Sequence, residues 1–319
     1  MLLKGITLLD LSSLLPLPFA ANLLAKQGAR VLKIESPNRL DPARIFGYVP
    51  PDKDTSSCYR ALNENKELVF LDLKNFKDRE KFYELVKTSR GVLEGYRPDV
   101  RKRLGIEYET LKSLNPAIVC CSLSGYKGKR ALRAGHDMNF IARSGILDQT
   151  RDAQGHCVML GAPFADYLSA YNSAFRLACA LYSAETTGKG CHLELSMEET
   201  LTEMQDPFMR ELLESQHFPN AGGTLVTGKY PCYFLYEIPG GTFALAALEP
   251  KFWEAFCKAI SREDLIPFHL ATGKKAKEVT SEVLKTLQTR SFQEWASFFE
   301  SVDCCIEPVL KLRDVSFGL

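Results

Sequence analysis

Two stretches of the sequence carry side chains suited to moving protons or forming covalent intermediates. The first, residues 134–140, contains His136 and follows an apolar, strand-like run at 117–123. The second, residues 161–166, places the Asp166 carboxylate at the start of a helical pattern. Loops after strands collect catalytic groups in α/β proteins, and a helix N-terminus favours a charged carboxylate. We therefore expect an ionised Asp166 that acts as a base or a nucleophile.

Each candidate residue also has an ordinary structural explanation. A His-Asp dipeptide such as His136-Asp137 is usually a surface pair, and Asp166 could simply cap a helix. Glu249 ends the apolar run 243–248 immediately before Pro250, a position at which most glutamates are exposed carboxylates at a helix start. Short motifs of this kind give many false positives. These residues alone therefore do not decide the function.

Composition narrows the class of protein. The chain has 319 residues and a formal charge of +1, which favours neither nucleic acid nor an anionic membrane as a partner. Asp10 and two prolines interrupt the apolar start, which we interpret as a strand and a helix, and no apolar run is long enough to span a bilayer. The ten cysteines lack C-x-x-C spacing, which predicts reduced thiols and a cytoplasmic protein. No histidine has a metal-site neighbour, so we expect no metal.

Strand and helix patterns alternate through the first two thirds of the chain. Strands are expected at 5–11, 29–34, 66–73, 91–96, 117–123 and 192–196, and helices at 18–26, 78–88, 167–185 and 197–215. This alternation predicts a large Rossmann-like α/β domain, residues 1–221, with a parallel sheet covered on both faces. Ligands bind such sheets at the carboxyl ends of the strands. The first turn has no G-x-G-x-x-G, so a dinucleotide site is not indicated.

The pattern changes after a Gly-rich linker at 219–225. Two strands at 230–236 and 242–247 are joined by Pro239-Gly240-Gly241, which predicts a hairpin. Helices are expected at 250–260, 276–289 and 292–300, the last with a capping box of Ser291 and Glu294. We assign residues 222–319 to a smaller α+β domain.

Several short motifs, taken in order and spacing, resemble family III CoA-transferases, which include carnitine and formyl-CoA transferases and the α-methylacyl-CoA racemases. They are Lys4-Gly5-Ile6 with Leu9-Asp10-Leu11-Ser12, Gly28-Ala29-Arg30-Val31, Leu71-Asp72-Leu73-Lys74, Ser124-Gly125-Tyr126, Gly135-His136-Asp137, Thr187-Gly188-Lys189-Gly190, residues 228–233, and Leu248-Glu249-Pro250. The motifs are closest to those of the racemases. The resemblance implies a two-lobed enzyme that acts on acyl-CoA thioesters, with its site between the lobes, and a homodimer of interlocked subunits.

The resemblance also assigns roles to residues. His136 and Asp166 would exchange a proton on opposite faces of the thioester α-carbon, epimerising a 2-methylacyl-CoA, and Glu249 would hold the His136 ring. Arg97 would meet a CoA phosphate through charged, bidentate donors, with Lys66 a weaker candidate. The remaining CoA and substrate contacts would come from Leu71, Asp72, Leu73 and Lys74 at the adenine end, and from Gly135, Asp137, Met138, Asn139 and Phe140 along the pantetheine and acyl path. No cofactor is expected beyond the CoA of the thioester.

Two other functions stay open. In the transferases of the family, the equivalent aspartate attacks the thioester and forms a mixed anhydride; this needs no histidine, so His136 favours the racemase. A CoA-binding protein without catalysis is the third hypothesis, because this chain has Ser36 where racemases carry an arginine. The sequence also ends without the family's C-terminal arm, which weakens the dimer prediction. Bulk at Tyr167 and Leu168, where the family has small residues, predicts a narrow acyl pocket.

Overall fold

The computed structural model describes residues 1–152, 154–218 and 220–316. The chain divides into two compact units, one of residues 1–147 with 158–215 and the other of residues 148–157 with 216–319. The domain boundary predicted between residues 221 and 222 stays a prediction, and Pro219 of the predicted linker lies outside the described residues. No helix in the described part of the chain combines the length and the apolar character needed to cross a bilayer.

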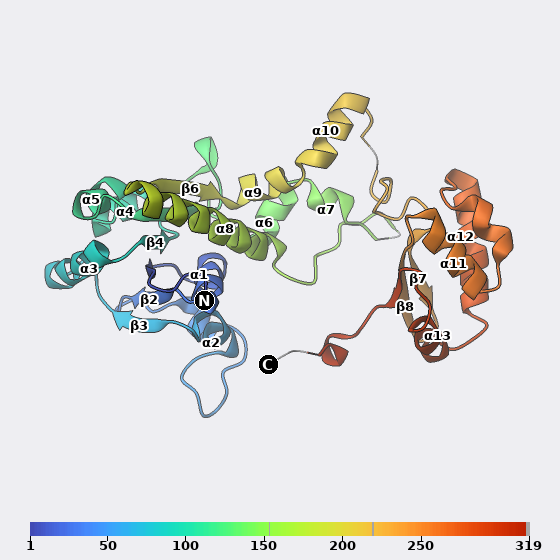
Figure 1. The fold of residues 1–319 in the computed structure, drawn as a ribbon, viewed down its shortest axis with the longest axis horizontal. Coiled ribbons are helices and arrows are strands. Elements are labelled where there is room, and N and C mark those ends of the chain that lie inside the picture. The colour runs from blue at the N-terminus through green and yellow to red at the C-terminus, as the bar shows by residue number, and fades with distance from the viewer. Residues whose placement is uncertain (153, 219, 317–319) are drawn as a thin grey trace. The chain divides into compact units, whose positions relative to one another are not determined.

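A six-stranded sheet forms the centre of the first unit, with the strand order β3-β2-β1-β4-β5-β6 (Figure 1). Its strands are β1 (Thr7–Asp10), β2 (Arg30–Glu35), β3 (Glu67–Phe70), β4 (Gly91–Glu94), β5 (Val119–Ser124) and β6 (His192–Ser196). Every neighbouring pair is parallel, which confirms the predicted α/β sheet. The strand order reverses between β1 and β4, and sheets of this kind bind ligands at the carboxyl edge beside that point.

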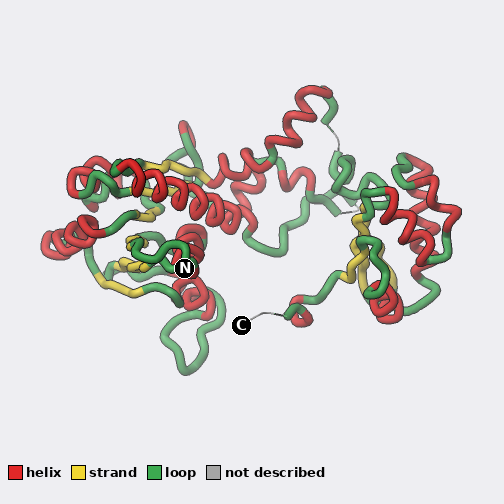
Figure 2. The backbone as a smooth tube through the Cα atoms, viewed as in Figure 1, coloured by secondary structure: helices red, strands yellow, loops and turns green. Residues whose placement is uncertain are grey.

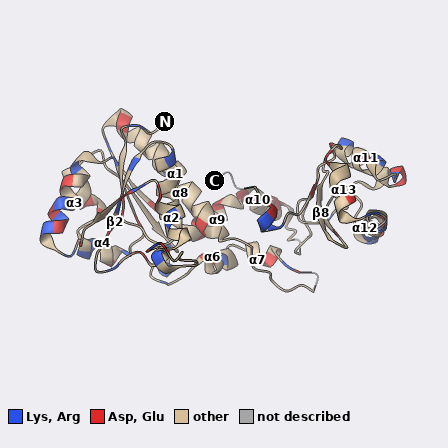
Figure 3. Cartoon of the chain, turned by 90° about the horizontal axis from the view of Figure 1, so that it is seen from below, with Lys and Arg blue, Asp and Glu red and all other residues tan. Residues whose placement is uncertain are grey.

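Alternate strand residues bury the two faces of this sheet, because successive side chains point to opposite sides. One face, which includes Leu8, Val31, Leu93 and Cys121, packs against α1 (Pro16–Lys26) and α8 (Phe164–Thr187). The other, which includes Leu9, Leu32 and Val92, packs against α3 (Phe76–Thr88) and α5 (Tyr108–Leu114). Each large apolar side chain buried in this way contributes about 1.5–3 kcal/mol. Helix α3 contains both basic and acidic residues along its length (Figure 3).

Several elements differ from the sequence prediction. The short helices α2 (Ser57–Asn63), α4 (Pro98–Leu104), α6 (Asp137–Arg143) and α7 (Ile146–Gln149) were not predicted, because one or two turns are too short to show a helical period. Helix α8 begins at Phe164, so Asp166 lies inside its first turn. The predicted helix at 197–215 is two helices, α9 (Met197–Met204) and α10 (Asp206–Ser215). Gly188 ends α8 in the left-handed conformation.

The second unit has an antiparallel sheet, ordered β7-β8-β9. It consists of β7 (Tyr233–Ile238), β8 (Gly241–Ala246) and β9 (Ile306–Pro308), with the helices α11 (Pro250–Ala259), α12 (Gly273–Leu287) and α13 (Phe292–Phe299), as Figure 2 shows. The predicted hairpin is confirmed, and Gly240 supplies the positive φ of +100° that its turn requires. The capping box of Ser291 and Glu294 at the start of α13 is also confirmed.

Candidate active site

The loop that leads to His136 is held by two glycines packed against an aromatic pair. The Tyr126 and Phe140 rings meet edge to face with centroids 5.0 Å apart, and both side chains are buried. A Cβ on Gly135 would lie 2.9 Å from both Phe140 Cε1 and the Tyr126 hydroxyl, and one on Gly125 would lie 2.6 Å from the Phe140 ring. Only glycine fits at either position. The motifs around residues 124–126 and 135–137 therefore interlock and fix the backbone just before His136.

His136 is the N-cap residue of α6. Its N–H donates to Asn139 Oδ1 at 2.9 Å, and the Asn139 N–H donates back to the His136 carbonyl at 2.8 Å. These bonds satisfy groups that a helix start otherwise leaves unpaired. Phe140 and Ile141 of the same helix are buried in the core beside α8, while the His136 side chain is exposed. The helix thus anchors itself by one side and leaves the imidazole accessible.

A hydrogen bond joins the start of α6 to the start of α8. The Asp166 N–H donates to Asp137 Oδ1 at 3.1 Å. The predicted catalytic residues His136 and Asp166 are thereby brought to one locality, since Asp137 is the immediate neighbour of His136. Asp137, predicted to contact the substrate, also makes this bond, which no motif in the sequence indicated.

The environment of Asp166 raises its pKa to about 6, mainly because the carboxyl group is partly buried and secondarily because Asp137 carries a negative charge nearby. The expectation that the helix N-terminus would stabilise the charged form is therefore wrong in direction: the loss of hydration outweighs the dipole. A carboxyl group with a pKa of about 6 is still mostly ionised at pH 7. It can also accept and release a proton within the physiological range.

An apolar hollow of about 340 Å³ lies beside this junction. Its lining consists of Asp137, Met138, Ile141, Leu147, Met159, Leu160 and residues 161–163. No lysine, arginine or histidine is among these described residues, so the hollow suits hydrocarbon. Tyr167 and Leu168, expected to narrow an acyl pocket, do not line this hollow. The Tyr167 ring packs edge to face on Phe19 of α1, with centroids 5.1 Å apart.

The residues predicted for the adenine end of CoA differ in accessibility. The side chains of Leu71 and Leu73 are buried in the core, so only the backbone of these residues can face a ligand. Lys74 is exposed, and Asp72 accepts a hydrogen bond from Asn38 Nδ2 at 2.9 Å. Arg97 is exposed at the N-cap of α4. The position is consistent with a contact to phosphate at the carboxyl edge of the sheet.

Lys66 is not placed to bind a CoA phosphate, the role that the sequence suggested for it. Its ammonium group is buried and donates to Asp10 Oδ2, the Pro18 carbonyl and Asn63 Oδ1, each at 2.8 Å. An ammonium group has three donors, so none is left for phosphate, and this candidate is wrong.

Lys66 instead belongs to a buried charged network that the sequence analysis missed. Lys33 Nζ lies 3.2 Å from Asp41 Oδ2 and 4.0 Å from Asp10 Oδ2, with all three side chains almost fully buried. The network ties β1 and β2 to the long connection between β2 and β3, whose loop runs at the lower left in Figure 2. A lysine within an otherwise apolar strand, as Lys33 is, was the available signal. Ser36 opens a turn on this connection, where the Arg39 N–H donates to the Ser36 carbonyl at 3.0 Å.

Glu249 belongs to the second unit. It is the N-cap residue of α11, its side chain is exposed, and its carbonyl accepts a hydrogen bond from the Phe252 N–H at 3.0 Å. The side chain makes no capping bond to its own helix. Its predicted partnership with His136 stays a prediction.

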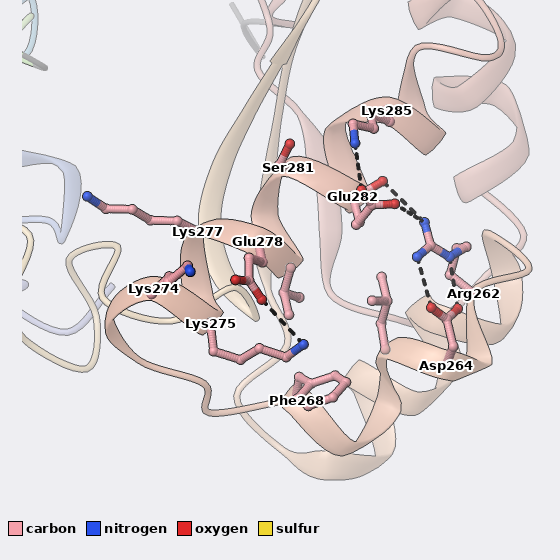
Figure 4. Close-up of a pocket in the computed structure, with 12 residues that line it drawn as sticks. Arg262, Asp264, Phe268, Lys274, Lys275, Lys277, Glu278, Ser281, Glu282 and Lys285 are labelled. Atoms are coloured by element: carbon pink, nitrogen blue, oxygen red, sulfur yellow. Dashed lines mark hydrogen bonds and ion pairs between the residues drawn. The ribbon is translucent and has the colours of Figure 1, made fainter.

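A second hollow, of about 610 Å³, lies on the second unit (Figure 4). Its charged side chains pair largely with one another: Arg262 binds Asp264 at 2.8 Å and Glu282 at 3.2 Å, and Lys275 lies 3.6 Å from Glu278. Lys274, Lys277 and Lys285 also belong to the lining, so its cations outnumber its carboxylates. Among the described residues, no three His, Cys, Asp or Glu side chains are placed to hold a metal ion.

A family model, described as CoA-transferase family III, matches residues 3–317. The chain belongs to this family. Human alpha-methylacyl-CoA racemase is 29% identical over 328 residues, which cover 99% of this chain and 79% of the racemase. Human succinyl-CoA:glutarate CoA-transferase is 27% identical over 325 residues, covering 98% and 73%.

Solved structures agree on the fold. A CaiB/BaiF family protein from Brucella suis superposes with a TM-score of 0.82 at 23% identity, covering 98% of this chain and 85% of that one. The family III relatives include a racemase and CoA-transferases, so this chain is an enzyme. The comparisons do not choose between the two reactions.

Proposed function

We propose that this family III enzyme epimerises the α-carbon of a 2-methylacyl-CoA by removing and returning its proton. The observation that carries the proposal is the bond between Asp166 and Asp137, which places a histidine-bearing helix start and a partly buried carboxyl group together beside an apolar hollow. Inversion at a carbon requires two groups that can exchange protons, one on each face of that carbon.

In this mechanism, ionised Asp166 takes the α-proton and becomes a neutral carboxylic acid, while the thioester becomes an enolate. A protonated His136 then gives its proton to the opposite face of the same carbon, which restores the thioester with inverted configuration. The reverse reaction uses the same groups in exchanged roles. Each contributes about 10²–10⁴-fold to the rate. Because solvent exchanges with the protons on both groups, turnover in heavy water labels the α-carbon.

The pKa of Asp166 favours proton transfer. A pKa of about 6 lets the carboxyl group take up and release a proton near neutral pH, as a reversible 1,1-proton transfer demands.

The lining of the hollow supports an uncharged aliphatic acyl group. Its side chains are chiefly those of Met and Leu, and its one charged residue, Asp137, is acidic. A dicarboxylic acyl group, such as succinyl, would bring a second carboxylate against apolar surface and like charge, and burying an unpaired charge is costly. The hollow thus argues against the dicarboxylate reactions named for several relatives.

The experiment is incubation of the enzyme with one epimer of a 2-methylacyl-CoA in heavy water, followed by chiral separation and mass spectrometry of the substrate. We expect inversion with uptake of one deuteron, and inversion lost in H136A and in D166N. Replacement of the exposed His156 by alanine is the matched control and should leave inversion unchanged. Inversion that survives in H136A contradicts the proposal.

A CoA-transferase is the second candidate, because relatives of that activity match nearly the whole chain. It predicts transfer of CoA to an added carboxylic acid, without α-proton exchange, and a covalent acyl adduct on Asp166. Mass spectrometry of the intact protein, trapped with substrate, distinguishes the two reactions.

The resemblance to the family supports two further parts of this proposal. Glu249 holds the His136 ring, and Arg97 and residues 71–74 contact CoA. We expect E249Q to lower kcat for epimerisation. We also propose that the reaction needs no cofactor besides the CoA of the thioester. Full activity after prolonged dialysis against EDTA supports this, and loss restored by a metal contradicts it. The ten free cysteines support the predicted cytoplasmic location.

We also propose that the enzyme is a homodimer. The support is the exposed face of α8, where Tyr171, Phe175 and Tyr182 are 57%, 67% and 75% exposed at helical spacing. Large aromatic side chains grouped in this way commonly mark interfaces. Sedimentation equilibrium should give twice the chain mass for the wild type and a lower mass for F175E. A wild-type monomer at micromolar concentration contradicts this part of the proposal.

A further inference from the structure

We infer that Asp137 is a positioning residue for Asp166: its carboxylate clamps the first turn of α8 to the start of α6 and sets a like charge beside the Asp166 carboxyl group. The inference rests on the proposed function for its catalytic meaning, but its two physical parts do not depend on any substrate. It gives Asp137 a role distinct from the substrate contact suggested by the sequence.

The clamp follows from the hydrogen bond. The Asp166 N–H belongs to the first turn of α8, where backbone donors have no intrahelical acceptor, and Asp137 Oδ1 supplies one at 3.1 Å from a different helix. An acceptor from the residue next to His136 couples the two catalytic groups directly. A shift of either helix start must break this bond or move the other helix with it.

The charge effect follows from what surrounds Asp166. In the first unit, the titratable groups near it are Asp137 and its neighbour His136 at the start of α6, Tyr167 on α8, and Cys58 of α2 beside Tyr167. Asp137 is the negative charge among them that acts on Asp166. Phe19 of α1 covers the Tyr167 side with an apolar ring. Asp166 is partly buried, and a nearby carboxylate disfavours a second negative charge there.

This arrangement has a chemical consequence. Asp137 binds the backbone of Asp166 and not its carboxyl group, so it changes the proton affinity of Asp166 without occupying the oxygens that must reach the substrate. The same carboxylate lines the apolar hollow, where it also disfavours anionic acyl groups.

Two variants separate the clamp from the charge. Asparagine at 137 keeps an oxygen that can accept the Asp166 N–H but has no charge, whereas alanine removes both. Carbon-13 NMR of aspartate-labelled full-length protein follows the titration of the Asp166 carboxyl group, assigned by its loss in D166N. We expect D137N to move this titration to lower pH by roughly one unit. Amide exchange at Asp166 should stay slow in D137N and become faster in D137A.

E80Q removes an exposed carboxylate on α3 and is the matched charge control, with no expected change in the Asp166 titration. An Asp166 titration that is the same in wild type and D137N overturns the inference. If D137A does not fold, D137N still tests the charge effect. Fast amide exchange at Asp166 in D137N would show that asparagine does not preserve the hydrogen bond, and would overturn the separation of clamp from charge.

Measurements with substrate distinguish this inference from the proposed function. If the wild type exchanges deuterium, the acid limb of its kcat profile should move to lower pH in D137N, with KM little changed. A titration that shifts in D137N in a protein that exchanges no α-proton overturns the proposed reaction and leaves the positioning role standing. If the wild type exchanges the α-proton but the Asp166 titration is the same in D137N, the proposed reaction stands and the positioning role of Asp137 is overturned.

Discussion

Replacing Gly135 by alanine tests how the aromatic pair positions His136. The new Cβ would lie 2.9 Å from Phe140 Cε1 and from the Tyr126 hydroxyl, about 0.5 Å short of the 3.4 Å at which ordinary contact begins. Both rings are buried, with 2% and 5% of their surface exposed, so neither can swing into solvent. The backbone before His136 must therefore move by several tenths of an ångström.

Two effects of this shift can be estimated. Overpacking of this kind costs about 1–3 kcal/mol of unfolding free energy. A 1 Å misplacement of a catalytic group can cost about 10²-fold in rate, so half of that displacement should cost roughly 10-fold in kcat. We expect G135A to show both losses, the second because the shifted residue is His136, the proposed proton donor.

Urea unfolding and deuterium exchange from heavy water measure the two losses. G161A is the control for stability, since a Cβ there meets nothing within 4 Å. Adding F140L to G135A removes part of the ring that the Cβ meets, so the double variant should be more stable than the sum of the single changes predicts. A G135A protein as stable and active as the wild type would refute the role of this contact.

Three further predictions concern other parts of the first unit. K66M leaves buried Asp10 with only the more distant Lys33 as a cationic partner and should lower the free energy of unfolding in urea by about 3–5 kcal/mol. The control K87M removes an exposed ion pair and should cost under about 1 kcal/mol. Equal losses in the two variants would contradict the role of the buried network. R97E should weaken CoA binding by about tenfold or more in calorimetry without moving the urea midpoint, and unchanged affinity would remove Arg97 from the site. Burial lowers the pKa of His192, so below about pH 6.5 this histidine binds a proton more readily in the unfolded chain than in the folded one. The free energy of unfolding should therefore fall as the pH drops below about 6.5. H192Q should show a flatter dependence between pH 7 and pH 5, and an unchanged slope would contradict that assignment.

Much of the fold could be predicted because it depends on local pattern. The strand predicted at 117–123 is an almost continuous apolar run, and such runs occur in parallel sheets buried on both faces. The hairpin around Gly240 and the cap at Ser291 follow from single residues with strong backbone preferences. The two-turn helix α6 could not be predicted, because it is held by tertiary contacts of Phe140 and by the cap at His136.

Site residues could be named in advance, but their environments could not. His136 and Asp166 stand out through motif order, whereas the pKa of Asp166 depends on burial and on a carboxylate 29 positions away along the chain. Lys66 shows the opposite error. Its charge suggested a phosphate ligand, and the folded chain uses all of its donors internally.

The sequence by itself determined which residues alternate, which cap and which are able to carry protons, because these properties belong to side chains and to short stretches of backbone. Only the tertiary structure decided that Asp137 bonds to Asp166, that Leu71 and Leu73 are inside the core, and that an apolar hollow lies beside α6. Hydration, electrostatic shifts and cavities arise between segments distant in the chain, and they exist only once those segments have packed together.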